Sequence, residues 1–214
     1  MKEIEIKSWC DFESEIQRLS RCREDREAGG RRLKAPLFRG LGNTKWGLET
    51  TLERSYPDER SDKTLSFRKY YWKAGGAKPA VETLTGKKWD AVPDFSQVDR
   101  LLREGKHLWL SDFLNEHPVI YEYLIYLRHH TFPSPLLDWT ASPYVADLFA
   151  FDAVPEGVEE ICIYGFLQDT LHGGSDLFIV GPYVQSDPRH FLQRAAITAR
   201  TPWASASVLQ CTMG

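Results

Sequence analysis

The stretch Leu136-Leu137-Asp138-Trp139-Thr140-Ala141-Ser142-Pro143 determines most of what this sequence predicts about its fold. Its first half predicts a short buried strand or turn. Ser142 and Pro143 predict the start of a helix, because serine caps the first free N–H groups and proline fits the first helical position. A carboxylate, an indole and two hydroxyl groups thus precede a helix N-terminus, which favours an anion or a polar ligand edge. The alternative is ordinary capping by Ser142, which does not exclude a ligand.

Outward from this stretch, the chain predicts strands at both ends around a helical middle. Alternating charged and apolar residues predict a strand over 3–7, and helical spacing predicts a helix over 8–27. Further strands are expected at 34–40, 160–167, 176–180 and 195–199. This order predicts the α+β class. Regular βαβ alternation and a GxGxxG motif are absent from the sequence, so a Rossmann or P-loop fold has no support.

The helical middle predicts helices over 65–72, 95–104, 108–114 and 118–130, and a further helix follows over 144–153. Gly75 and Gly76 begin a polar stretch that predicts an exposed, irregular loop as far as Pro93. The tail from Arg200 to Gly214 shows little pattern and is assigned to no element.

The charge of the 214-residue chain is distributed unevenly. The net charge is −3, yet residues 60–110 carry eleven Lys and Arg against six Asp and Glu. A nucleic-acid-binding coat over the whole protein is therefore excluded, while a local basic face is allowed. The aromatic residues interleaved there would suit stacking on a single-stranded nucleic acid or, equally, a helical core. They are Tyr70, Tyr71, Trp72 and Trp89.

The sequence predicts a cytoplasmic protein. No apolar run approaches the ~20 residues of a membrane helix, and the charged start is unlike a secretory signal. The four cysteines show no CxxC spacing and the histidines share no ligand spacing, so no metal is expected.

Arg39, between Phe38 and Gly40 at a predicted strand end, is an unusual residue for packing. The glycine allows backbone or ligand to approach closely, and the planar guanidinium suits a phosphate or a ribose edge. The alternative is that Arg39 pairs with a core carboxylate such as Asp138. Gln193 by itself predicts only a surface side chain. Candidate carboxylates in the C-terminal half are Glu159, Glu160, Asp169, Asp176 and Asp187.

Three blocks resemble the FRG domain, a family named for the triplet that Phe38-Arg39-Gly40 matches. The block 128–150 resembles the family's histidine-to-helix signature without a gap, and 189–197 resembles its closing motif more weakly. Thr131 stands where the family usually has glycine. Ala195 and Ile197 replace the closing glycine and phenylalanine. The resemblance covers about residues 35–200.

The order of these motifs also resembles that of ADP-ribosyltransferases. This resemblance implies a split antiparallel β core over 35–200, with NAD in its cleft and a basic helical insertion over 60–128. A strand and helix (1–34) would precede this domain, and the unplaced tail (201–214) would follow it. The implied catalytic residues are Arg39, Asp138 and Gln193. The implied NAD contacts are Arg39, Gly40, His129, Trp139, Thr140, Ser142 and Tyr144.

The function that follows from the resemblance is an NAD-dependent mono-ADP-ribosyltransferase, a bacterial toxin or antiphage effector that modifies RNA or protein. An antitoxin or another regulator would accompany it, and no membrane partner is expected. Two alternatives stay open: a non-catalytic module that binds a nucleotide or a partner, and an NAD glycohydrolase.

Overall fold

The computed structural model describes residues 2–29, 35–56, 67–104, 110–166, 177–180, 195–200 and 208–213. Seven strands in these ranges form one sheet in the order β1-β7-β4-β2-β3-β6-β5. In chain order they are β1 (Lys2–Ile6), β2 (Leu37–Leu41), β3 (Leu136–Thr140), β4 (Ile161–Phe166), β5 (Leu177–Val180), β6 (Ala195–Arg200) and β7 (Val208–Met213). Neighbouring strands are antiparallel except β1 and β7, which are parallel. The predicted mixture of α and β structure is confirmed.

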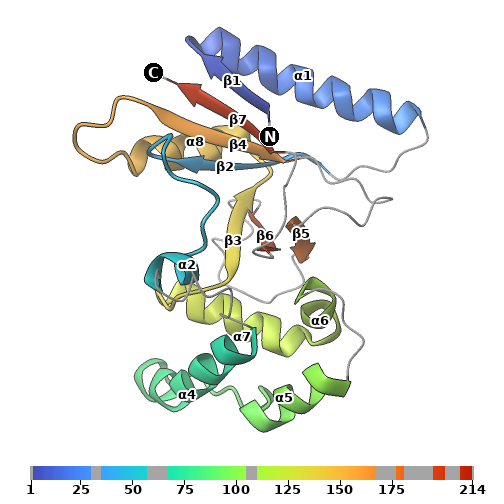
Figure 1. The fold of residues 1–214 in the computed structure, drawn as a ribbon, viewed down its shortest axis with the longest axis vertical. Coiled ribbons are helices and arrows are strands. Elements are labelled where there is room, and N and C mark those ends of the chain that lie inside the picture. Colours follow the sequence, from blue (N-terminus) through green and yellow to red (C-terminus); the bar gives the residue numbers. More distant parts are fainter. Residues whose placement is uncertain are drawn as a thin grey trace.

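The sheet divides between β2 and β3. These two strands share the single pair Phe38–Thr140, whereas β2 pairs with β4, and β3 with β6, along their whole lengths. In Figure 1, β2 lies across the molecule while β3 runs down from it. We call the place where the strands separate the β2–β3 junction. It joins residues about a hundred positions apart in the sequence.

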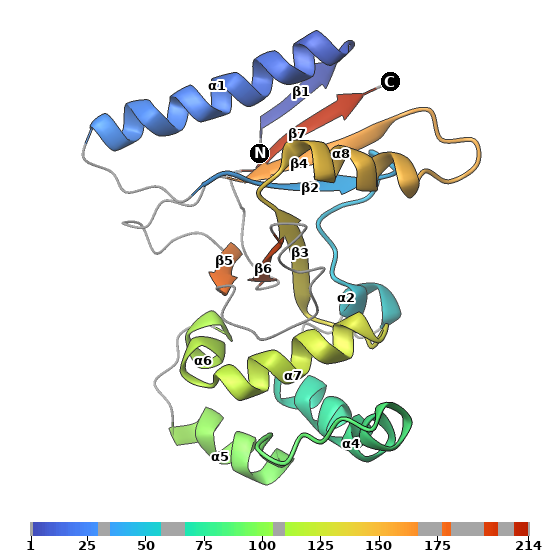
Figure 2. The ribbon, with the colours of Figure 1, turned by 180° about the vertical axis from the view of Figure 1, so that it is seen from behind.

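Helices lie at both ends of the molecule (Figure 2). They are α1 (Trp9–Ala28), α2 (Thr51–Ser55), α4 (Phe67–Thr85), α5 (Phe95–Glu104), α6 (Leu110–Glu116), α7 (Pro118–His129) and α8 (Pro143–Asp152). Both views place α1 and α8 beside the half that contains β1, β7, β4 and β2, and α4 to α7 beyond β3. The sequence predicted the helices at α1, α5, α7 and α8 to within one or two residues.

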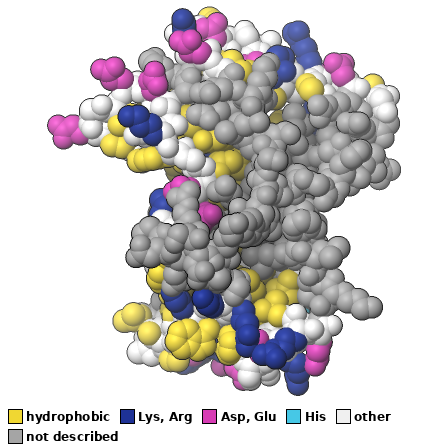
Figure 3. Space-filling model, viewed as in Figure 1, with side chains coloured by type: hydrophobic (Ala, Val, Ile, Leu, Met, Phe, Trp, Pro, Cys, Tyr) yellow, Lys and Arg dark blue, Asp and Glu magenta, His cyan; other side chains and the backbone are white. Residues whose placement is uncertain are grey.

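The helical end has its own core, which buries most of the aromatic residues considered above. Tyr70, Tyr71 and Trp89 are buried, and α7 adds six buried side chains to the same cluster. The Tyr123 hydroxyl donates to the Ala74 carbonyl at 2.9 Å, so this buried phenol is hydrogen-bonded. Trp72 alone of the four is exposed. Figure 3 shows Lys and Arg side chains across the lower surface of this part.

The expected loop from Gly75 to Pro93 is wrong over its first part, because α4 continues through both glycines to Thr85. Glycine weakens a helix by only about 1 kcal/mol per residue, which tertiary packing can offset. Here Tyr70, Tyr71 and Ala74 anchor the helix in the core. Helix α4 also contains Pro79, one turn beyond Gly75. Gly86, with φ +71°, follows the last helical residue.

The tail left unassigned by the sequence contains β7, which lies between β1 and β4 in the sheet. Leu209 is paired with both Lys2 and Gly165 in the strand register. The N-terminal strand therefore joins the sheet through the C-terminal one. In the part of the chain that the structure describes, no helix is long and apolar enough to span a membrane.

Candidate functional site

Arg39 spans the β2–β3 junction. Side chains alternate along a strand, so Arg39 leaves β2 on the same side as Leu37 and Leu41, which pack with Leu137 and Trp139 of β3. Its Nη1 donates to the backbone carbonyl of Asp138 at 2.7 Å. One hydrogen bond thus links the two halves of the sheet just beyond their only shared pair in the strand register.

The surroundings of Arg39 are unfavourable for a positive charge. Burial lowers the pKa of Arg39 to about 10; the charge of Asp138 opposes this shift, and the charges of Arg128 and Arg54 add to it. The Nε atom is also buried and has no hydrogen-bond acceptor within the described ranges. A buried donor without an acceptor costs about 1–3 kcal/mol. An anion that reached Arg39 would supply the missing acceptor and offset the charge.

Arg128, at the end of α7, pairs with the carboxylate of Asp138. Its Nε lies 2.7 and 2.8 Å from the two carboxylate oxygens, its Nη2 bonds to Oδ2, and its Nη1 donates to the Leu136 carbonyl at 2.8 Å. The Arg128 side chain is 13% exposed and that of Asp138 53%. The alternative that Arg39 pairs with the Asp138 carboxylate is therefore wrong, because Arg128 takes this carboxylate and Arg39 the backbone carbonyl.

Sequence reasoning missed Arg128, since a cation in the last turn of a helix is adequately explained by the helix dipole. Its place as the first residue of the family-like block 128–150 was the signal that could have found it.

We expect Asp138→Asn to lower the free energy of unfolding by about 1–2 kcal/mol, because it leaves the mostly buried Arg128 without its counter-charge. Urea unfolding would measure the loss. The matched control is Glu27→Gln, which removes the exposed pair between Glu27 and Arg23 on α1 and should cost less than about 0.5 kcal/mol. Equal losses in the two variants would show that the Arg128–Asp138 pair contributes no more than an ordinary surface pair.

Arg54 is held near Arg39 by helix α2. Thr50 and Glu53 form a capping box that starts this helix. The Leu52 N–H then donates to the Ser134 carbonyl at 3.1 Å, and the Ser134 N–H donates to the Thr51 hydroxyl at 2.9 Å. These bonds fix α2 against the segment that leads into β3. Three guanidinium groups, those of Arg39, Arg54 and Arg128, are thus gathered around the junction.

Gly40 is required by packing against α8. A Cβ atom built on Gly40 would lie 1.8 Å from the Ala146 carbonyl oxygen and 2.9 Å from the Ala150 Cβ. The sequence predicted that either backbone or a ligand approaches Gly40 closely. In the described structure it is the backbone of α8 that does so. Phe38, on the same side of β2, is buried with Ala146 and Ala150.

The sequence model of the FRG domain matches residues 34–157. This is more than half of the chain. The chain belongs to the FRG domain family. A search of curated proteins and a search of solved structures found no significant match.

The FRG match includes β2, β3 and α8, so both sides of the junction belong to the family's domain. Each residue of its triplet has a separate physical role here. Phe38 is buried beneath α8, Arg39 spans the junction, and Gly40 allows α8 to approach β2. Packing accounts for the first and third residues and leaves only the arginine for chemistry.

Thr131, where FRG domains usually have glycine, has a left-handed backbone with φ +65°. Glycine adopts this conformation without strain, whereas a β-branched residue rarely does. The Thr131 hydroxyl donates to the His130 carbonyl at 2.7 Å. The backbone that the family's glycine favours is therefore kept here at some cost in strain.

The hydroxyl groups of this FRG domain that precede α8 cap the helix. The Thr140 hydroxyl accepts from the Ser142 N–H at 3.1 Å, and the Ser142 hydroxyl accepts from the Val145 N–H at 3.4 Å. The predicted N-cap at Ser142 and first-turn proline at Pro143 are confirmed. Ser142 is thus the N-cap, and Thr140 holds the turn that precedes it.

The other implied NAD contacts lie in different surroundings. Trp139 is only 2% exposed and packs with side chains of β2 and β4, so its ring serves the core. Tyr144 is exposed, with its ring centroid 5.8 Å from that of Trp9 on α1. His129 is exposed at the last position of α7. Of the implied set, Arg39, Asp138, Trp139 and Thr140 meet at the junction.

Gln193 and the candidate acids Asp169, Asp176 and Asp187 lie outside the described residues. Glu159 and Glu160 are exposed just before β4. Among the side chains that the structure places, no group of three His, Cys, Asp or Glu could hold a metal ion.

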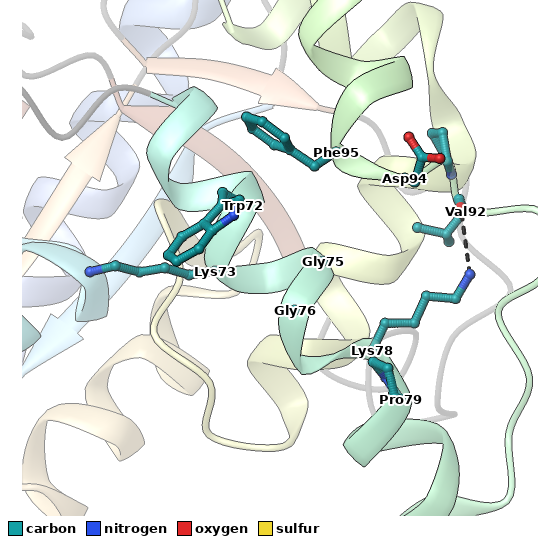
Figure 4. A pocket seen from close by; sticks show the side chains of 10 residues that line it. Trp72, Lys73, Gly75, Gly76, Lys78, Pro79, Val92, Asp94 and Phe95 are labelled. Carbon is teal, nitrogen blue, oxygen red and sulfur yellow. Dashed lines mark hydrogen bonds between the residues drawn. The ribbon is translucent and has the colours of Figure 1, made fainter.

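A cavity of about 610 Å³ lies in the helical part of the FRG domain, away from the junction (Figure 4). It is lined by residues of α4, among them Trp72, by the segment before α5, and by Phe95 at the start of α5. The Lys78 ammonium donates to the Val92 carbonyl at 3.3 Å across it. Its lining contains no residue of the implied NAD site.

Proposed function

We propose that this FRG domain is an NAD-dependent mono-ADP-ribosyltransferase whose diphosphate-binding residue is Arg39. The observation that carries the proposal is the partly buried Arg39 side chain at the β2–β3 junction, whose Nε donor is buried and has no acceptor in the described ranges. The resemblance to ADP-ribosyltransferases implies a divided sheet. It also implies that the motifs around Arg39 and Asp138, which are distant in the sequence, lie together. Both support the proposal.

The reaction requires binding and charge stabilisation more than a strong nucleophile. The bond between C1′ of the ribose and the nicotinamide nitrogen breaks, and its electron pair leaves with nicotinamide. The acceptor atom then bonds to C1′ and loses a proton to the solvent. The transition state resembles an oxocarbenium cation, so the enzyme must hold the diphosphate and orient the ribose. Arg39 would bind the diphosphate, with Arg54 adding positive potential.

Asp138 has the role of a positioning residue in this proposal. Its carboxylate is occupied by Arg128, and its carbonyl accepts from Arg39. This favours orienting Arg39 over direct stabilisation of the cation. Gln193 stays the proposed late catalytic residue on the resemblance alone. The Ser142 hydroxyl, at the start of α8, is the proposed contact for a ribose or phosphate oxygen.

We propose RNA or protein as the acceptor, and a toxin or antiphage effector controlled by an antitoxin or regulator as the biological role. These rest on the family resemblance. Support for RNA comes from residues 67–104, which carry eight Lys and Arg against five Asp and Glu, and from the exposed Trp72.

The competing function is a non-catalytic module that binds a nucleotide at the same arginine. It is favoured by the pairing of Asp138 with Arg128, because a carboxylate already neutralised by a cation is less able to stabilise a second one.

Incubating the purified protein with NAD labelled on its adenylate phosphate, with and without a cell lysate, tests the proposal. We expect nicotinamide release together with label on a macromolecule; label that resists protease but is lost to RNase would identify RNA. Nicotinamide release without any macromolecular label would replace the transferase by a hydrolase. If calorimetry showed that NAD binds, but neither nicotinamide nor a labelled macromolecule were formed, the non-catalytic binding module would replace the transferase.

A further inference from the structure

Helix α8 has apolar side chains on its outer face as well as on its inner one, although it lies at the surface. Its inner face, with Ala146 and Ala150, is fully buried against β2. Its outer face bears Tyr144, Leu148 and Phe151, spaced four and three residues apart and therefore on one stripe. Leu148 is 65% exposed and Phe151 58%. An apolar helix face is normally buried, and no element in the described part of the chain covers these side chains.

The apolar stripe continues beyond α8. The ring of Trp9 on α1 lies against Tyr144 and is itself half-exposed. Val154, just after the helix, is also exposed, and so is Phe149 on the far side of Asp152. A continuous apolar patch of this kind with a polar rim is typical of a protein interaction site, whereas single exposed apolar residues are not.

The rim of the patch is acidic. Residues 141–166 contain five acids and no Lys or Arg. Asp147 and Asp152 lie on either side of the stripe, since the helical period places them about 60° and 80° from Tyr144 around the axis. The Asp147 Oδ1 atom is buried and has no hydrogen-bond donor in the described part of the chain. Its burial raises the pKa of Asp147. A cation docked beside Asp147 would favour the charged form of this carboxylate.

We propose that the outer face of α8, with Trp9, docks a basic amphipathic helix of a partner protein. The apolar side of that helix would cover Tyr144, Leu148 and Phe151, and its Lys or Arg residues would lie beside Asp147 and Asp152. A second copy of this chain fits less well. A twofold interface would bring the same acidic rim against itself, which costs affinity.

Two synthetic peptides of about 18 residues, one built from Leu and Lys and the other from Leu and Glu with the same apolar stripe, test the charge preference. Fluorescence anisotropy with the full chain should show the Lys peptide binding at least about tenfold more tightly, a difference of about 1.4 kcal/mol. Equal affinity for both peptides, or no binding of the Lys peptide, would overturn the proposal.

The double variant Leu148→Gln/Phe151→Gln tests the place of binding, because it removes apolar area from exposed positions and keeps helix-forming residues. We expect a loss of about tenfold or more in affinity for the Lys peptide. Leu84→Gln is the matched control, since Leu84 is 86% exposed at the end of α4 and should not affect binding. Unchanged affinity in the double variant would refute the site. Sedimentation that showed a dimer of the unmodified chain, lost in the double variant, would replace the partner by a second copy.

Discussion

Gly40→Ala is expected to lower the free energy of unfolding by about 3 kcal/mol or more, and to prevent folding if the total stability is small. The added methyl group would lie 1.8 Å from the carbonyl oxygen of Ala146. That oxygen is part of the α8 backbone, so the whole helix would have to move away from β2. The buried contact of Phe38 with Ala146 and Ala150 would be lost with it.

The matched control is Gly76→Ala on α4, where a Cβ atom would meet nothing within 4 Å. Here we expect a gain of about 0.5–1 kcal/mol, because alanine loses less backbone freedom than glycine in a helix. Urea unfolding followed by circular dichroism would measure both variants. A Gly40→Ala protein as stable as the control would contradict the packing of α8 on β2.

Arg39→Met is expected to lower NAD-dependent labelling about 10²–10³-fold while leaving the free energy of unfolding within about 1 kcal/mol of the unmodified protein. The two effects differ because the Arg39 charge is partly desolvated and its buried Nε has no acceptor in the described structure, so the residue contributes little to stability. Methionine fills a similar volume without the charge. The cost to activity follows from losing a charge-assisted bond in the transition state.

Arg39→Lys separates charge from shape, because lysine keeps the positive charge and loses the planar set of donors. We expect it to remain impaired. Arg103→Met, on the exposed surface of α5, is the control and should label normally. Full labelling by Arg39→Met would remove Arg39 from the site. A large loss of stability would show instead that Arg39 is structural.

Local features of this fold could be predicted because their causes are local. Ser8 and Ser142 each accept a backbone N–H three residues later, and the sequence predicted the helices α1 and α8 that they begin. At β3 a short apolar run predicted a buried strand or turn, and the structure has the strand. The FRG resemblance depended on continuous blocks around Arg39 and Asp138, and the match over 34–157 confirms that family.

The sequence by itself determined the class of fold, the family and the caps, since these depend on neighbours a few residues away. Only the tertiary structure decided that Arg128 takes the Asp138 carboxylate, that Gly40 admits a helix, and that the tail supplies β7. Each of these three contacts joins segments that are distant along the chain. For the Asp138 carboxylate, the fold also decides between two arginines that could bind it equally well. Hydrogen bonds and contacts of that kind depend on where the backbone has already been placed by packing, which local residue patterns do not encode.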